Sequence, residues 1–149
     1  MSNLDLDICY LSASEALEKF KNKSLSPVEL LTETIKRIEN VNPKINAFNF
    51  FRFEEALKEA KQSEIKYSEN KSTLPLEGLP LAIKDEVNVK GHPNKNGSLI
   101  YKDTIAEGTD VDVESLVSSG AIIHARTTNP EFSLTSFCHS KVNGVTRNP

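Results

Sequence analysis

Lys84 is the residue of this sequence that could most readily do acid–base chemistry. It closes a segment whose apolar residues alternate as on one face of a strand (Leu79, Leu81 and Ile83), and the lysine falls on the other face. A free lysine titrates near ~10.4, so it becomes a base at neutral pH only where burial and neighbouring hydroxyls disfavour its charge. The residues alone leave two interpretations open: a solvated lysine at the end of a strand, which is the commoner situation, and a sheltered general base.

The other residues with chemical potential form no recognisable site. The histidines lack the spacing of metal ligands, and His124 lies in an apolar run that favours a hydrogen-bonded place in the core. Cys138 and His139 are adjacent, so in an extended segment they would point to opposite faces, which is a poor arrangement for a nucleophile and its base. The pair Ser118-Ser119 before Gly120 is typical of a helix end. We therefore expect no metal site at these residues, nor at His92 or Cys9.

Helices are predicted over most of residues 10–66. Ser12 with Glu15 has the spacing of a capping box, and Ser26-Pro27-Val28-Glu29 starts a second helix in the same way. Asn42-Pro43 is expected to end that second helix, a short extended segment should follow over 45–50, and a third helix over about 52–65.

The second half of the chain, residues 78–149, has the composition of an α/β core. All six glycines lie at or after Gly78. A strand over 79–85, a helix capped by Thr109 or Asp110 and closed by Gly120, and a strand over 121–125 form a βαβ pattern, which predicts parallel strands. About two dozen residues of low periodicity separate Asp85 from Gly108, and such a long loop at the end of a strand is usually functional.

Several motifs in this half resemble the amidase signature hydrolases. Gly78-Leu-Pro-Leu-Ala-Ile-Lys84-Asp85 is similar to their Gly-x-Pro-x-x-x-Lys-Asp motif. Further segments resemble the family in the same order, from about residue 10 to the last residue, namely 25–30, 46–48, 87–91, 109–110, 120–123, 126–132 and 144–149. The resemblance implies an α/β/α sandwich around a mixed, largely parallel sheet, preceded by N-terminal helices. Residues 1–149 would be the N-terminal portion of that domain.

The resemblance also implies an activity, the hydrolysis of a carboxylic amide by a Ser-cisSer-Lys triad without a cofactor. Lys84 maps onto the lysine of that triad, which takes and returns protons through the cis serine. The two serines belong to a Gly-Gly-Ser-Ser-Gly-Gly type segment after the Asn-Pro motif, and this sequence ends at Pro149, so we expect it to be inactive alone. Residues 133–136 align with a loop that lines the acyl pocket, which makes Leu134, Thr135 and Ser136 candidate substrate contacts; an ordinary polar turn is the alternative.

Three hypotheses about the role of the chain stay open. It is the N-terminal part of an amidase, a non-catalytic fragment or partner of a polypeptide that carries the serines, or a glutamyl-tRNA amidotransferase A-type subunit. The wording of 86–93 and 127–132 is more similar to stand-alone amidases than to the amidotransferase.

Composition narrows the possible partners. The chain has 149 residues, 18 basic and 21 acidic, and a net charge of −3, which argues against general nucleic-acid binding. No apolar run is long enough to span a membrane, and residues 1–8 lack the pattern of a signal peptide, so we expect a cytoplasmic protein with a small amide substrate. A sheet that lacks its later strands exposes an edge, so we also expect self-association or poor solubility.

Overall fold

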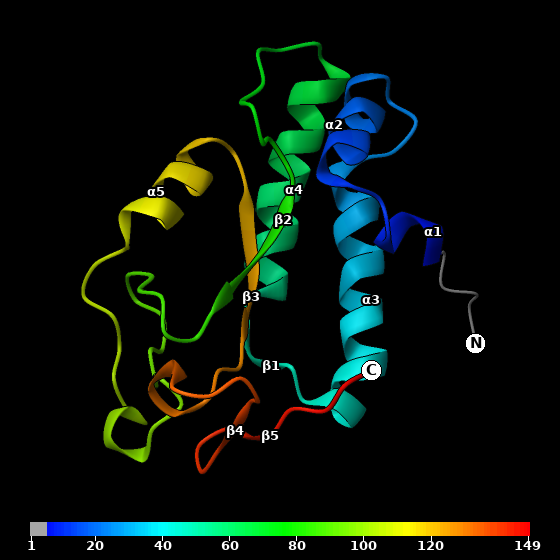
Figure 1. The fold of residues 1–149 in the computed structure, drawn as a ribbon. Coiled ribbons are helices and arrows are strands. Elements are labelled where there is room, and N and C mark those ends of the chain that lie inside the picture. The colour runs from blue at the N-terminus through cyan, green and yellow to red at the C-terminus, as the bar shows by residue number, and fades with distance from the viewer. Residues whose placement is uncertain (1–5) are drawn as a thin grey trace. The chain divides into compact units, whose positions relative to one another are not determined.

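The computed structural model describes residues 6–149 (Figure 1). These residues form two compact units. The first unit comprises residues up to Asn40, Arg52–Leu81 and Leu116–His124. The second comprises Val41–Phe51, Ala82–Ser115 and Ala125–Pro149. Residues 1–5, on which part of the signal-peptide expectation rests, lie outside the described residues. No helix within 6–149 combines the length and the apolar character needed to cross a membrane.

Four helices dominate the first half of the chain: α1 Leu6–Cys9, α2 Ala13–Lys21, α3 Pro27–Ile45 and α4 Phe53–Ser68. The two predicted helix starts are confirmed. Ser12 and Glu15 form a complete capping box. At the start of α3, the Glu29 carboxylate accepts from the Ser26 backbone N–H at 2.8 Å, and the Ser26 hydroxyl accepts from the Glu29 N–H at 3.1 Å. These reciprocal bonds satisfy amide donors that a helix start leaves unpaired.

The predicted end of α3 at Asn42-Pro43 is wrong, because the helix continues through Pro43 to Ile45. Pro43 lacks the N–H that would bond four residues back, and its ring crowds the carbonyl there, so the helix continues for only two residues beyond it. The actual end depends on Asn42, whose side-chain oxygen accepts from the backbone N–H groups of Ala47 and Phe48 at 2.8 and 2.9 Å. Asn46 follows the helix with a φ of 53°, the left-handed conformation common after a helix end.

The first unit has two apolar clusters that bind the helices together. Phe20 of α2 is buried against Tyr67 of α4, with ring centroids 5.7 Å apart. The second cluster joins α3, α4 and the start of β3, and its buried members are Leu31, Ile35, Ala56, Ala60 and Ile122. The helical face predicted for α4 is therefore confirmed at its two alanines.

A sheet of three strands has the order β1-β3-β2, with β1 Phe48–Phe51, β2 Pro80–Lys84 and β3 Ile122–Thr127. Strand β1 runs antiparallel to β3. Strands β2 and β3 are parallel, because Ile122 N–H donates to the Leu79 carbonyl near their starts and Asp85 N–H donates to the Thr127 carbonyl near their ends. The sheet is thus mixed, as expected for this fold class, and the first five residues of β3 are fully buried.

The long segment after β2 is folded back on itself. It contains the short helix η1 Leu99–Tyr101 and an antiparallel bridge between Pro93 and Ile105, and it leads into α5 Val111–Ser118. The side chains of Thr109 and Asp110 accept from the backbone N–H groups of Lys90 and Asn88, so they anchor this segment. Asp110 directly precedes α5, as predicted, and its backbone carbonyl accepts from the Glu114 N–H at 3.0 Å. Helix η2 Glu131–Ser133 and the two-residue strands β4 His139–Ser140 and β5 Gly144–Val145 complete the second unit.

Candidate active site around Lys84

Lys84 is the last residue of β2, and its side chain points away from the buried face of that strand. Ile83 is 6% exposed, whereas the Lys84 side chain is 44% exposed. The alternation predicted from the sequence is therefore present. Of the two interpretations that the sequence left open, the described residues favour the lysine at the surface, because Lys84 is half exposed and bonded to polar groups there.

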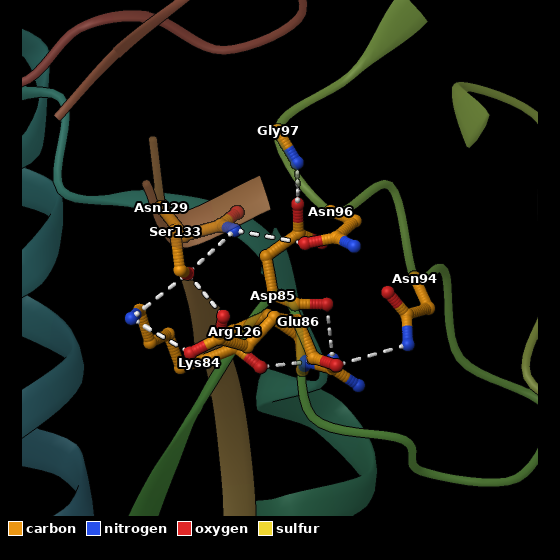
Figure 2. Close-up of polar contacts among 9 residues, drawn as sticks. All are labelled: Lys84, Asp85, Glu86, Asn94, Asn96, Gly97, Arg126, Asn129 and Ser133. Carbon is orange, nitrogen blue, oxygen red and sulfur yellow. Dashed lines mark hydrogen bonds and ion pairs between the residues drawn. The ribbon is translucent and has the colours of Figure 1, made fainter. Parts of the chain in front are cut away.

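Two side chains hold the Lys84 amine, and we call Lys84, Glu86 and Ser133 the Lys84 cluster (Figure 2). The Lys84 Nζ lies 2.7 Å from Glu86 Oε1 and donates to Ser133 Oγ at 3.2 Å. The Ser133 hydroxyl donates in turn to Glu86 Oε2. Hydrogen bonds from Lys84 and then from Ser133 hold the pKa of the Glu86 carboxyl below its usual value. The cluster is a closed ring of charge-assisted bonds.

Ser133 reaches Lys84 because the chain turns sharply in η2. Phe132 and Ser133 both have left-handed backbone conformations, with φ of 51° and 54°. Such conformations are uncommon outside glycine, asparagine and aspartate, and they occur often at functional sites. The amide of Asn129, a fully buried residue, also donates to Ser133 Oγ at 3.4 Å. The Ser133 hydroxyl is thus held by Asn129, which precedes η2, as well as by Lys84 at the end of β2 and by Glu86.

A buried cation fixes the backbone that carries Lys84. Arg126 of β3 has no exposed surface, and its Nη2 donates to the carbonyls of Lys84, Asp85 and Val87 at 3.0, 3.0 and 2.6 Å. Burial lowers the pKa of the Arg126 guanidinium, and the charges of Asp85 and Asp110 oppose this effect. Because one guanidinium nitrogen binds all three carbonyls, residues 84–87 cannot shift without breaking these bonds.

Asp85 points the opposite way from Lys84 and supports the loop beyond it. Asp85 is 1% exposed, and its carboxylate accepts from the backbone N–H groups of Lys95 and Gly97 at 3.3 and 3.4 Å. The Lys-Asp pair of the motif is therefore divided in role: Lys84 belongs to the surface cluster, and Asp85 ties the loop to the interior (Figure 2).

The three residues named as candidate substrate contacts lie just after the cluster. Leu134 is 79% exposed, and Thr135 and Ser136 are also exposed. The Thr135 hydroxyl donates to the Phe137 carbonyl at 2.9 Å, which is the behaviour of a polar turn. Their role toward a substrate stays a prediction, whereas their neighbour Ser133 contacts Lys84 directly.

Sequence reasoning missed Glu86 as a partner of the lysine. Strand alternation could not have found it, because β2 ends at Lys84 and Glu86 lies in the turn that follows, in which the Val87 N–H donates to the Lys84 carbonyl at 3.1 Å. The contribution of Ser133 had no local signal either, since 49 residues separate it from Lys84. No group of three or more potential metal-ligating side chains occurs within residues 6–149.

The chain has clear relatives. A family model described as Amidase matches residues 29–149. The A-type subunit of the glutamyl-tRNA(Gln) amidotransferase of Methylacidiphilum infernorum is 36% identical over 139 residues, which cover 93% of this chain and 27% of that protein. Indoleacetamide hydrolase of Bradyrhizobium diazoefficiens is 33% identical over 138 residues, which cover 93% of this chain and 26% of that protein.

Solved structures of amide-hydrolysing enzymes are also similar to this chain. A fatty acid amide hydrolase superposes on the whole of this chain with a TM-score of 0.90 and 25% identity, and the match covers 26% of that hydrolase. A bacterial aryl acylamidase of the amidase signature family gives a TM-score of 0.87 over 95% of this chain and 30% of its own. This chain spans less than a third of the length of the relatives described here. Since the family model covers residues 29–149, the chain belongs to the amidase signature family.

Proposed function

We propose that this chain provides the lysine of an amide-hydrolysing site, with Lys84 as the residue that takes and returns the proton. The observation that carries the proposal is the place of Lys84: it ends β2 within the family motif, and its amine already binds a serine hydroxyl and a carboxylate. The reaction is hydrolysis of a carboxylic amide to an acid and ammonia or an amine, in the cytosol, with no cofactor.

The proposed reaction needs a group that accepts a proton and later donates it. A serine hydroxyl attacks the amide carbonyl only as it loses its proton, and the departing nitrogen must gain one. An uncharged Lys84 amine would accept the proton through the cis serine and then return it to the leaving group. The two serines of this triad would come from a Gly-Gly-Ser-Ser-Gly-Gly type segment, which residues 1–149 do not contain.

The names of the relatives support one reaction class, the hydrolysis of an amide bond, and do not point to a single substrate. Their names specify indoleacetamide, fatty acid amides and aryl acyl amides, which differ in the acyl part and share the amide bond. Leu134, Thr135 and Ser136 are our candidates for contacts with the acyl group, because they directly follow the cluster residue Ser133.

A fusion protein tests this proposal. Residues 1–149 would replace the matching segment of the indoleacetamide hydrolase, so that the relative provides the remaining part of the domain. We expect the fusion to hydrolyse indoleacetamide and the 149-residue chain alone to be inactive. A fusion that folds, as judged by circular dichroism and thermal unfolding, yet shows no hydrolysis would contradict the proposal. Hydrolysis by the chain alone that Lys84→Ala abolishes would contradict the expected inactivity of the isolated chain.

The amidotransferase relative favours a second function. At 36% identity to the A-type component of a glutamyl-tRNA(Gln) amidotransferase, the chain could belong to an enzyme that passes ammonia to a charged tRNA. Reconstitution of this chain with the polypeptides that co-purify with it would distinguish the two functions. Ammonia transfer to glutamyl-tRNA in that complex would rank this function first, whereas free ammonia release with no associated polypeptide would rank the stand-alone amidase first.

A further inference from the structure

We propose that Arg126 is a positioning residue for Lys84, and that it acts through a single nitrogen of its guanidinium, Nη2. The catalytic consequence of this inference rests on the proposed function, because it takes Lys84 as the proton carrier. The structural part does not rest on that function, because Arg126 binds the turn that begins at Lys84 within the described residues (Figure 2).

The turn that begins at Lys84 is built around the Arg126 side chain. The Val87 N–H donates to the Lys84 carbonyl at 3.1 Å, which closes the turn. Arg126 Nη2 donates to this same carbonyl at 3.0 Å, and to the carbonyls of Asp85 and Val87 at 3.0 and 2.6 Å. Three carbonyls directed at one charged donor fix the path of the backbone. The side chains of Lys84 and Glu86 therefore leave the turn in set directions, and they meet in the Lys84 cluster.

The other two nitrogens of the guanidinium do not contribute to the turn. Arg126 Nε and Nη1 are buried and have no hydrogen-bond partner among the described residues. Nη2 has two N–H donors for its three carbonyls, whereas the ammonium of a lysine has three donors on one nitrogen, at the end of a chain one atom shorter. These contacts predict that a lysine can take the place of Arg126 and that a neutral side chain cannot.

Arg126 also connects the two segments that form the Lys84 cluster. It lies on β3, which ends at Thr127, and the chain continues from there to Ser133 in η2. Asn129 lies on this path, is fully buried, and donates from its amide to the Ser133 hydroxyl at 3.4 Å. The bonds of Arg126 therefore fix the turn of Lys84 against the strand from which the Ser133 segment continues.

Amide hydrogen exchange tests the structural part on the 149-residue chain. The backbone N–H groups of Asp85 and Val87 donate to carbonyls at 2.9 and 3.1 Å, so both report on the turn. In Arg126→Gln we expect both amides to exchange at least about 10-fold faster, because the turn loses its bonds to a charged donor. The Arg147 N–H, which donates at 2.8 Å to the last carbonyl of α3, should keep its rate.

Arg52 provides the matched control, because it also binds the backbone of β3. Its Nη1 donates to the Ile123 carbonyl at 3.0 Å, and its Nη2 lies 3.1 Å from Glu59 Oε1. Arg52→Gln removes both contacts and none of the bonds to the turn. The exchange rates of Asp85 and Val87 should therefore stay within about twofold of the native rates in this variant.

Arg126→Lys distinguishes positioning from a general loss of stability. We expect it to restore the slow exchange that Arg126→Gln loses. In the fusion with the indoleacetamide hydrolase, with rates normalised to the folded fraction, Arg126→Gln should lower kcat by about 10- to 100-fold and leave KM within about twofold. A displaced proton carrier slows the reacting step and leaves substrate binding unchanged, and Arg126→Lys should recover most of the lost kcat.

Two results for Arg126→Gln would overturn the proposal: native exchange at Asp85 and Val87, or an equal rise there and at Arg147, which would show a general loss of stability. If Arg126→Gln does not fold, Arg126→Lys decides. Native exchange at both amides in a folded Arg126→Lys chain supports the proposal, and fast exchange at both contradicts it. An active fusion whose normalised kcat survives Arg126→Gln would contradict the catalytic consequence. An inactive unchanged fusion would count against the proposed function and leave the exchange result intact.

Discussion

His124 is the residue whose environment makes the clearest claim about pH. It lies in β3, is 4% exposed and hydrogen-bonds to the backbone of Leu81. Burial lowers its pKa from 6.5 to about 4, against the smaller opposite effect of that hydrogen bond. The prediction of a core histidine is confirmed, and a metal or catalytic role is not needed to explain it.

Stability should consequently fall as the pH drops below 6.5. In the unfolded chain the imidazole takes up a proton near its ordinary pKa, while the folded chain resists until about 4, so the loss begins at the higher value and levels off near the lower one. Between a pH of ~7.5 and ~5, His124 alone should cost about 2 kcal/mol of unfolding free energy. Urea unfolding at several pH values measures this.

His124→Gln provides the comparison, because it removes the titration at this site. We expect its stability to change less over the same pH interval, whereas the exposed His139→Gln should keep the native pH dependence. Identical pH dependence in the native chain and in His124→Gln would contradict the account.

The site itself was only partly predictable at this scale. Lys84 was found because its motif and its place at a strand end are local features of the sequence. Its exposure was left open by the sequence, and the structure places it at the surface beside a carboxylate and a hydroxyl. Whether a side chain is buried depends on segments far away in sequence, and local patterns carry little information about them.

At the scale of elements, Gly97 holds the long loop close to η2. It has a φ of 63°, and a Cβ at this position would lie 2.6 Å from the Pro130 carbonyl oxygen. Gly97→Ala must therefore push the loop away from Pro130 and from the Asp85 carboxylate that binds the Gly97 N–H. We expect a loss of about 2–4 kcal/mol in unfolding free energy, which combines the backbone strain with the steric clash.

Gly91→Ala isolates the backbone part of that cost. Gly91 has a φ of 80°, but a Cβ there would meet no atom within 4 Å. Gly91→Ala should lower the unfolding free energy by about 1 kcal/mol, which urea titration measures. A Gly97→Ala variant as stable as Gly91→Ala would mean that the close approach to Pro130 does not constrain the loop.

Element boundaries were predictable where neighbouring residues determine them. The capping pairs at Ser12 and Ser26 are local, and both helices begin as predicted. The end of α3 was missed because we placed it at the proline. The helix ends instead where the Asn42 side chain binds the backbone N–H groups of Ala47 and Phe48. The anchoring role of Asp110 was missed for a similar reason, because its carboxylate binds Asn88, 22 residues earlier in the chain.

At the scale of the whole molecule, we expect self-association of the 149-residue chain. Strands β1 and β2 are the edges of the described sheet, and edge strands favour pairing with other chains. Large apolar side chains are also exposed in the second unit, among them Ile100 at 78% and Phe137 at 66%. Light scattering after size-exclusion chromatography should give a mass that rises with concentration.

Replacement of both exposed side chains, by Ile100→Ser and Phe137→Ser, should reduce that rise. The paired substitution leaves the sheet edges in place, so some association should remain. A monomer at every concentration, with a sharp and reversible unfolding transition, would contradict the expectation.

The central claim is that Lys84 carries the proton in amide hydrolysis, and the turnover of the fusion enzyme with Lys84→Ala tests it most directly. Lys102→Ala is the matched control, because Lys102 lies in the same unit, is 61% exposed and is 3.8 Å from its acidic neighbour Asp103. We predict that Lys84→Ala lowers kcat by about 10²–10⁴-fold, the contribution of a positioned proton carrier, and that Lys102→Ala stays within about twofold of the unchanged fusion. A folded Lys84→Ala fusion that turns over indoleacetamide as fast as the Lys102→Ala control would contradict the claim.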